Sequence, residues 1–157
     1  MKKYLLPIIS LLFATSLFSS VSAGDFDRQI KARQAYMQLY AFNLGILGAM
    51  AKGDMDYNAD LAKASAGNLL SVAKMNNGAM WPKGSDMETA GNEKLTWAKA
   101  VIWTSFPQVG AKHQALTDAA TKMAAEAGNG IDSIRANIGA VGMSCGGCHK
   151  PFREPKS

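Results

Sequence analysis

The chain has little cysteine and little histidine: two of each occur among 157 residues, and aromatic residues make up 8%. Two cysteines are too few for a disulfide-rich scaffold or a four-cysteine zinc site. Hydrophobic residues reach 48%, charged residues 18%, and the 15 glycines follow no strict period. A disordered tail and a collagen-like rod are therefore excluded, and the length predicts one globular domain.

The first 23 residues are typical of a secretory signal peptide. Two lysines precede an apolar stretch over residues 4–18, and small residues lead to a cleavage site after Ala23. A permanent membrane anchor would need about 20 apolar residues and no cleavage site. Cleavage leaves residues 24–157 as a single exported domain and lowers the net charge from +5 to +3 by removing two lysines. We therefore expect no nucleic-acid partner and no membrane association after cleavage.

Apolar residues recur at helical spacing through most of the exported domain. The pattern predicts helices over residues 25–52, 58–75 and 95–127 and a fourth from about residue 131, with an irregular connection over residues 77–94. No segment alternates with the period of two that a strand requires. Four amphipathic helices of this length predict an all-α fold, an antiparallel four-helix bundle.

Some details of the helices are also predicted. In the first helix the inward rows are Ile30, Met37, Leu44 and Ala51, with the companion row Arg33, Tyr40 and Leu47. Pro107 lies inside the third helical pattern, so we expect a kink or a break just before it. Pro151, close to the end of the fourth helix, removes a backbone donor and favours an early end there.

The chemistry lies in Cys145-Gly146-Gly147-Cys148-His149, near the end of the fourth helix. The pattern C-x-x-C-H is the attachment site of haem c. Its two thiols form thioethers with the vinyl groups of the porphyrin, and the next residue offers an imidazole to the iron. A thiol–disulfide exchange site would need a βαβ framework, and a zinc site would need two further ligands, for which only His113 and a carboxylate are at hand.

With these motifs the chain resembles the cytochrome c′ family, whose members are four-helix-bundle c-type cytochromes. The resemblance extends over nearly all of residues 24–157. Its motifs are Arg33-Gln34-x-x-Met37, Met50-Ala51-Lys52-Gly53, Trp81-Pro82-x-Gly84-Ser85, Ile102-Trp103, and Cys145 to His149 followed by Phe152-Arg153. It implies a periplasmic protein with one covalent haem c near the C-terminal end of the fourth helix.

The resemblance also implies roles for individual residues. Cys145 and Cys148 are expected to be the thioether anchors and His149 the proximal iron ligand. Arg33 and Gln34 are expected on the propionate side of the haem, Glu93 and Thr96 at its edge, and Arg153 beside the imidazole, since it follows His149 by four residues. The alternative for Arg153 is that it is a solvent-exposed charge near the C-terminus.

Met37 decides what the haem does. If its sulfur ligates the iron, the site is six-coordinate and suited to electron transfer; if not, an apolar pocket is left for a small gas such as NO or CO. The family includes both kinds of protein, so both outcomes stay open. We expect a non-enzymatic protein with a redox partner, of acidic surface, and a homodimer formed where Gly45, Gly48 and Ala49 allow close approach. A haem-dependent catalyst of peroxide or nitric oxide chemistry and a thiol–disulfide oxidoreductase are the alternatives.

Overall fold

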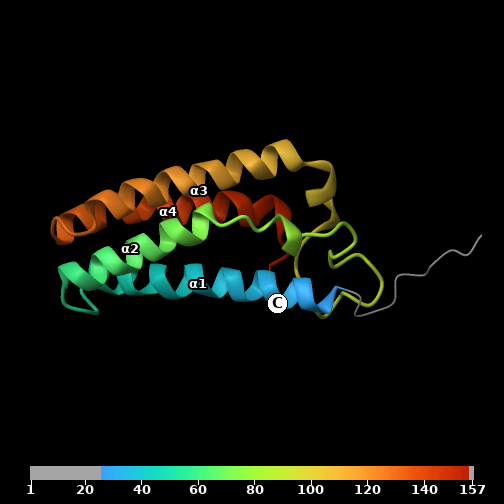
Figure 1. Cartoon of the computed structure of the whole chain (residues 1–157), viewed down its shortest axis with the longest axis horizontal. Coiled ribbons are helices and arrows are strands. Elements are labelled where there is room, and N and C mark those ends of the chain that lie inside the picture. The colour runs from blue at the N-terminus through green and yellow to red at the C-terminus, as the bar shows by residue number, and fades with distance from the viewer. Residues whose placement is uncertain (1–25, 156–157) are drawn as a thin grey trace, which may run out of the picture.

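The computed structural model describes residues 26–155, so the predicted signal peptide over residues 1–23 lies outside the described part. Within residues 26–155 the chain forms four α-helices and no strand (Figure 1). The helices are α1 (Asp27–Lys52), α2 (Ala59–Lys74), α3 (Phe106–Glu126) and α4 (Ile131–Phe152), with two 3-10 helices, η1 (Gly78–Met80) and η2 (Ala100–Thr104). The all-α four-helix bundle predicted from the sequence is confirmed.

Local sequence explains most of the helix ends. Gly53 ends α1 in the left-handed conformation, with a φ of 86°, and its N–H donates to the carbonyl of Met50. The Asn58 side chain accepts a hydrogen bond from the backbone N–H of Leu61, which caps the N-terminus of α2. None of the described helices is long and apolar enough to cross a membrane.

The predicted start of the third helix was wrong. The α-helix begins at Phe106, and residues 95–105 form turns and the 3-10 helix η2 instead. Pro107 lies in the first turn of α3, where its missing N–H costs nothing because no helical acceptor precedes it. The expected break before Pro107 is thus the start of the helix. At the other proline, α4 continues one residue beyond Pro151 and ends at Phe152.

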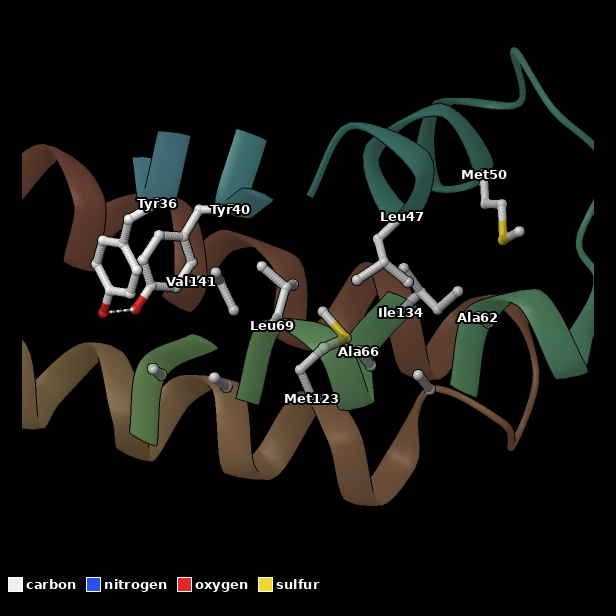
Figure 2. Close-up of a cluster of buried hydrophobic side chains, with 13 residues drawn as sticks. Tyr36, Tyr40, Leu47, Met50, Ala62, Ala66, Leu69, Met123, Ile134 and Val141 are labelled. Carbon is white, nitrogen blue, oxygen red and sulfur yellow. Dashed lines mark hydrogen bonds between the residues drawn. The ribbon is translucent and has the colours of Figure 1, made fainter. Parts of the chain in front are cut away.

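The main core runs between all four helices (Figure 2). Leu47, Ala62, Met123 and Ile134 are fully buried there, one from each helix. In α1 the buried rows are Arg33, Tyr40 and Leu47, as predicted, and Tyr36, Asn43 and Met50. In the predicted row through Met37, Ile30 is buried and Leu44 and Ala51 are partly buried, but Met37 itself is 38% exposed, so its predicted inward position was wrong.

A long connection, residues 75–105, joins α2 to α3 at one end of the bundle (Figure 1). The beginning of α1 and the C-terminal end of α4 lie at this same end. The connection pairs directly with the residues that end α4. Lys99 donates its N–H to the carbonyl of Phe152 over 3.0 Å, and Glu154 donates to the carbonyl of Trp97 over 2.8 Å. The longest irregular segment of the described chain therefore packs against the C-x-x-C-H motif.

Candidate functional site

The C-x-x-C-H motif lies within the last two turns of α4. Cys145 and Cys148 are both free thiols and both half-buried. Residues three and four positions apart share one face of a helix, so the thiol of Cys145 shares a face with Cys148 and with His149. His149 is more exposed than the cysteines. The helix thus presents two thiols and an imidazole together at the end of the bundle.

Burial sets the protonation of these three groups. It raises the pKa of the Cys145 thiol and of the Cys148 thiol, the latter against the opposing charge of Lys112. A thiol–disulfide exchange site needs the opposite shift, because its nucleophile is the thiolate. Burial, assisted by the positive charge of Arg153, lowers the pKa of His149. The imidazole is therefore neutral at pH 7, which is the form that ligates a metal ion.

Arg153 follows α4 in an extended conformation, with φ and ψ of −132° and 137°, and does not continue the helix. Its N–H donates to the carbonyl of His149 over 2.9 Å, and it forms an isolated antiparallel bridge with Ala98. Its charge also acts on His149, as the lowered pKa of that imidazole indicates. The predicted proximity of Arg153 and His149 is present, and a backbone bridge to the long connection maintains it.

Arg33 is 3% exposed and holds the long connection against α1. Its guanidinium donates to the Ser85 hydroxyl over 2.6 Å, to the Ser85 carbonyl, and to the Thr96 hydroxyl over 2.8 Å. It also lies 4.7 Å from the ring centre of Trp81, within the range of a cation–π contact. The buried charge has the partners that its position on the inward row demands.

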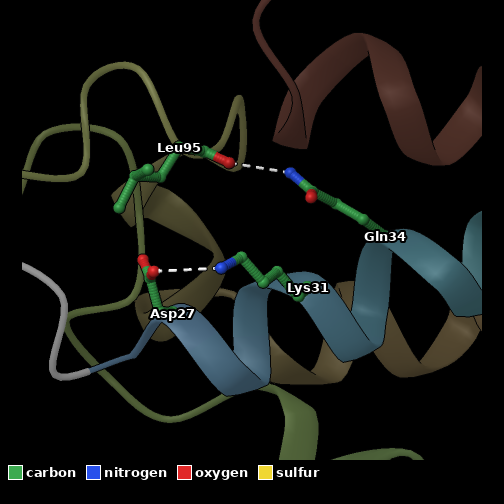
Figure 3. Close-up of polar contacts among 4 residues, drawn as sticks. All are labelled: Asp27, Lys31, Gln34 and Leu95. Carbon is green, nitrogen blue, oxygen red and sulfur yellow. Dashed lines mark hydrogen bonds and ion pairs between the residues drawn. The ribbon is translucent and has the colours of Figure 1, made fainter.

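Gln34 is exposed and lies beside this contact (Figure 3). Its side-chain amide donates to the carbonyl of Leu95 over 2.7 Å, next to Thr96. One turn earlier on α1, Lys31 pairs with Asp27 over 3.3 Å at the surface. Glu93 is exposed and accepts a hydrogen bond from the backbone N–H of Gly91, so its contact is local to the connection. The structure brings Arg33, Gln34 and Thr96 together and leaves Glu93 apart.

The tyrosines on either side of Met37 face the core. The Tyr36 hydroxyl donates to the carbonyl of Val72 over 3.0 Å and accepts from Asn77 over 2.9 Å. The Tyr40 hydroxyl lies 2.8 Å from that of Tyr36, which leaves Tyr40 as the donor (Figure 2). Burial raises the pKa of Tyr40, and the nearby Cys145 adds to the effect. Tyr40 therefore lies near the Cys145 thiol, whereas Met37 is 38% exposed.

A second apolar cluster covers Cys148. Its buried members are Ala98, Ile102 and Phe152, and Trp81, Trp103, Val109 and Cys148 pack against it. Asp86, which sequence reasoning missed, accepts a hydrogen bond from Trp103 Nε1 over 2.5 Å. In the sequence, Ser85 was noted only as the last residue of the Trp81-Pro82-x-Gly84-Ser85 motif, and no sequence pattern indicated a role for Asp86. His113, the other histidine, is half-buried on α3 and outside the motif.

These side chains fit a covalently held haem. Two protonated thiols stand next to a neutral imidazole, an apolar cluster with indole rings covers one of the thiols, and polar groups of Gln34 and Arg33 lie nearby. Cys145 and Cys148 would form the thioethers and His149 would ligate the iron. When bound, haem c supplies reversible one-electron redox chemistry at its iron. The fold and the site together define a four-helix-bundle c-type cytochrome.

Comparison with known proteins gives the family. The family model described as Cytochrome C′ matches residues 28–153. A cytochrome c′ of Cereibacter sphaeroides is 36% identical over 138 residues, which are 88% of this chain and 91% of that one. Among solved structures, a cytochrome c′ from Rhodobacter spheriodes superimposes with a TM-score of 0.79 at 35% identity, covering 84% of this chain and 99% of that one. The chain belongs to the cytochrome c′ family.

One further solved structure is a nitric oxide complex of a variant cytochrome c prime from Alcaligenes xylosoxidans. It has a TM-score of 0.69 and 28% identity, and the match covers 83% of this chain and 97% of that one. Members of the family bind haem c covalently, so the predicted cofactor is confirmed at the level of the family.

Proposed function

We propose that this protein is a periplasmic haem c cytochrome that transfers electrons and binds small gases such as NO or CO, without turning over a substrate. The observation that carries the proposal is the pair of free, half-buried thiols with the adjacent neutral imidazole on α4 of a cytochrome c′ bundle. The leader over residues 1–23, which ends at Ala23, supports export to the periplasm, where haem c proteins of this family are expected.

Gas binding requires that the second axial position of the iron stays open. Met37 is the residue expected on that side, and it is 38% exposed on α1 and is not packed in the protein core. The nitric oxide complex of the Alcaligenes xylosoxidans relative supports a gas-binding site in this fold. The absorption spectrum of the reduced protein with and without CO tests the proposal.

Peroxide or nitric oxide turnover would require a polar donor free to act at the iron. The hydroxyls of Tyr36 and Tyr40 are instead bonded to each other, and that of Tyr36 also donates to the carbonyl of Val72. These contacts favour binding and electron transfer over catalysis. A raised thiol pKa at Cys145 and Cys148 likewise disfavours thiol–disulfide exchange.

The redox partner is expected to be acidic at its contact surface. Lys112 reaches the motif from α3: a β-carbon at Gly147 would lie 3.8 Å from its ammonium nitrogen. Lys150 follows His149 directly and is exposed. Positive charge next to the haem attachment site steers an acidic protein toward it, and the effect weakens as salt is added.

We also propose a homodimer through the exposed face of α1 and α2. Phe42 is 68% exposed, Leu39 49% and Leu61 38%, and Gly45 has no heavy atom within 4 Å of where a β-carbon would be. A structurally similar cytochrome c′, with a TM-score of 0.74 and 25% identity, is described as having a ligand-controlled dimer dissociation. Large exposed apolar side chains suit an interface between copies. Of the small residues expected there, Gly48 faces Ile138 of α4, so it lies outside this surface.

A single charge tests this interface. We expect Phe42→Glu to lower the dimer fraction at least tenfold in sedimentation velocity, because it would desolvate a carboxylate at the contact. The matched control is Phe106→Glu, which changes another exposed phenylalanine, 57% exposed, at the start of α3. A dimer that survives Phe42→Glu, or one that Phe106→Glu disrupts equally, would contradict the proposed surface.

A further inference from the structure

Asp86 is a buried carboxylate in the long connection. It is 3% exposed, although free carboxylates almost always lie at the surface. Its oxygens accept hydrogen bonds from Trp103 Nε1 over 2.5 Å, from the Thr89 N–H over 3.0 Å and from the Thr89 hydroxyl over 3.1 Å. These bonds lower the pKa of Asp86 against the effect of burial, so the group is charged at neutral pH.

A buried positive charge lies close to this carboxylate. Arg33, 3% exposed, contacts Ser85, the residue that precedes Asp86. Burial lowers the pKa of Arg33 to about 10, and the charge of Asp86 opposes that change. The charge of Asp86 therefore favours the charged form of Arg33, and neutral hydrogen-bond partners stabilise both buried charges.

Trp103 links Asp86 to the end of α4. Its indole N–H is bonded to Asp86, and its ring packs against the apolar cluster that contains Cys148 and Phe152. Phe152 in turn accepts a backbone hydrogen bond from Lys99 of the connection. A shift of the Trp103 ring would therefore disturb the apolar cluster against which Cys148, one of the two expected thioether residues, also packs.

We propose that Asp86 is a positioning residue of the haem site: its carboxylate orients the Trp103 indole against the Cys148 end of α4 and places a fixed negative charge near the haem. The proposal rests on haem attachment at Cys145 and Cys148. It goes beyond the assignment of the haem-binding residues. In this proposal Asp86, a residue of the long connection, influences both the surroundings of the haem and its redox potential.

Three variants of the haem-loaded protein separate the hydrogen bond from the charge. Asp86→Ala removes both, Asp86→Asn keeps an acceptor oxygen for Trp103 without the charge, and Trp103→Phe keeps an aromatic ring without the donor. The measurements are the circular dichroism of the Soret band, which reports the asymmetry of the haem surroundings, and the midpoint potential. Loss of a nearby negative charge favours the reduced haem, which carries one more electron.

We expect Asp86→Ala to change the Soret dichroism and to raise the midpoint potential. Asp86→Asn should raise the potential with a dichroism close to that of the unmodified protein, and Trp103→Phe should change the dichroism with a smaller change of potential. Asp118→Asn is the control, since Asp118 is an exposed carboxylate on α3 bonded to Gln114.

Two results would overturn the proposal. One is an Asp86→Asn protein with an unchanged potential, even if it unfolds at a lower temperature, because that would leave Asp86 a purely structural role. The other is an equal rise of potential in Asp118→Asn, which would make the shift an effect of net charge alone. If the unmodified protein itself carries no covalent haem on a haem-stained gel, the proposed function fails and the role of Asp86 fails with it, whereas an unchanged potential in haem-loaded Asp86→Asn overturns the role of Asp86 alone.

Discussion

The double variant Cys145→Ala/Cys148→Ala is expected to lose covalent haem completely. On a denaturing gel stained for haem, the unmodified protein should give a band at its own mass and the double variant none. The reason is local chemistry, because these are the chain's two cysteines and each provides one thioether. Each single variant should keep one bond and give a weaker band.

Histidine variants serve as controls for this experiment. His149→Ala keeps both thiols, so its band should remain while the absorption spectrum changes through loss of the axial imidazole. His113→Ala should change neither, because His113 lies on α3 and outside the motif. A stained band at full strength in the double cysteine variant would contradict the assignment of the attachment site.

Arg33→Ala is expected to cause the largest loss of stability among polar changes near the site. It leaves the buried Ser85 carbonyl without its donor, removes one of the two donors to the Thr96 hydroxyl, and removes the buried positive charge near Asp86. Each such loss costs about 1–3 kcal/mol, so we expect about 3 kcal/mol in total. In thermal unfolding of the haem-loaded protein this corresponds to a fall in Tm of about 10 °C.

Two further variants serve as references for the Tm of Arg33→Ala. Arg33→Lys keeps the charge but offers a single compact ammonium in place of the planar fork, so it should fall between Arg33→Ala and the unmodified protein. Arg28→Ala removes an exposed arginine from the same helix and should change stability by no more than about 0.5 kcal/mol. Equal Tm values for Arg33→Ala and Arg28→Ala would show that the connection is not held by this contact.

Periodicity predicted the helices well because each must bury one face in a bundle. The C-terminal end of α1 and the turn before α4 followed from glycines, whose conformations are local properties. The start of α3 was wrong because Trp97, Ile102 and other apolar residues of the connection have helical spacing. Those residues are buried by the end of α4 and not by a helix of their own, and this contact is set by distant parts of the chain.

The motif on α4 could be recognised because its five residues are contiguous. Arg33 and Thr96 were also found, through the family resemblance, and the structure places them in contact. Asp86 and its bond to Trp103 could not be found, since 17 positions separate the two residues and no pattern connects them. Met37 was expected on the inward face because an ideal repeat of seven was assumed, whereas the buried residues around it are Tyr36, which no predicted row contained, and Tyr40, which one did.

The absorption spectrum of the reduced protein, recorded with and without CO, tests most directly that this cytochrome binds gases. With the second axial position open, the spectrum without CO should be high-spin and should shift when CO is added. Met37→Ala should then behave in the same way, because its sulfur takes no part in ligation. A low-spin spectrum that is indifferent to CO, and that becomes sensitive to CO in Met37→Ala, would contradict the proposal and show that Met37 ligates the iron.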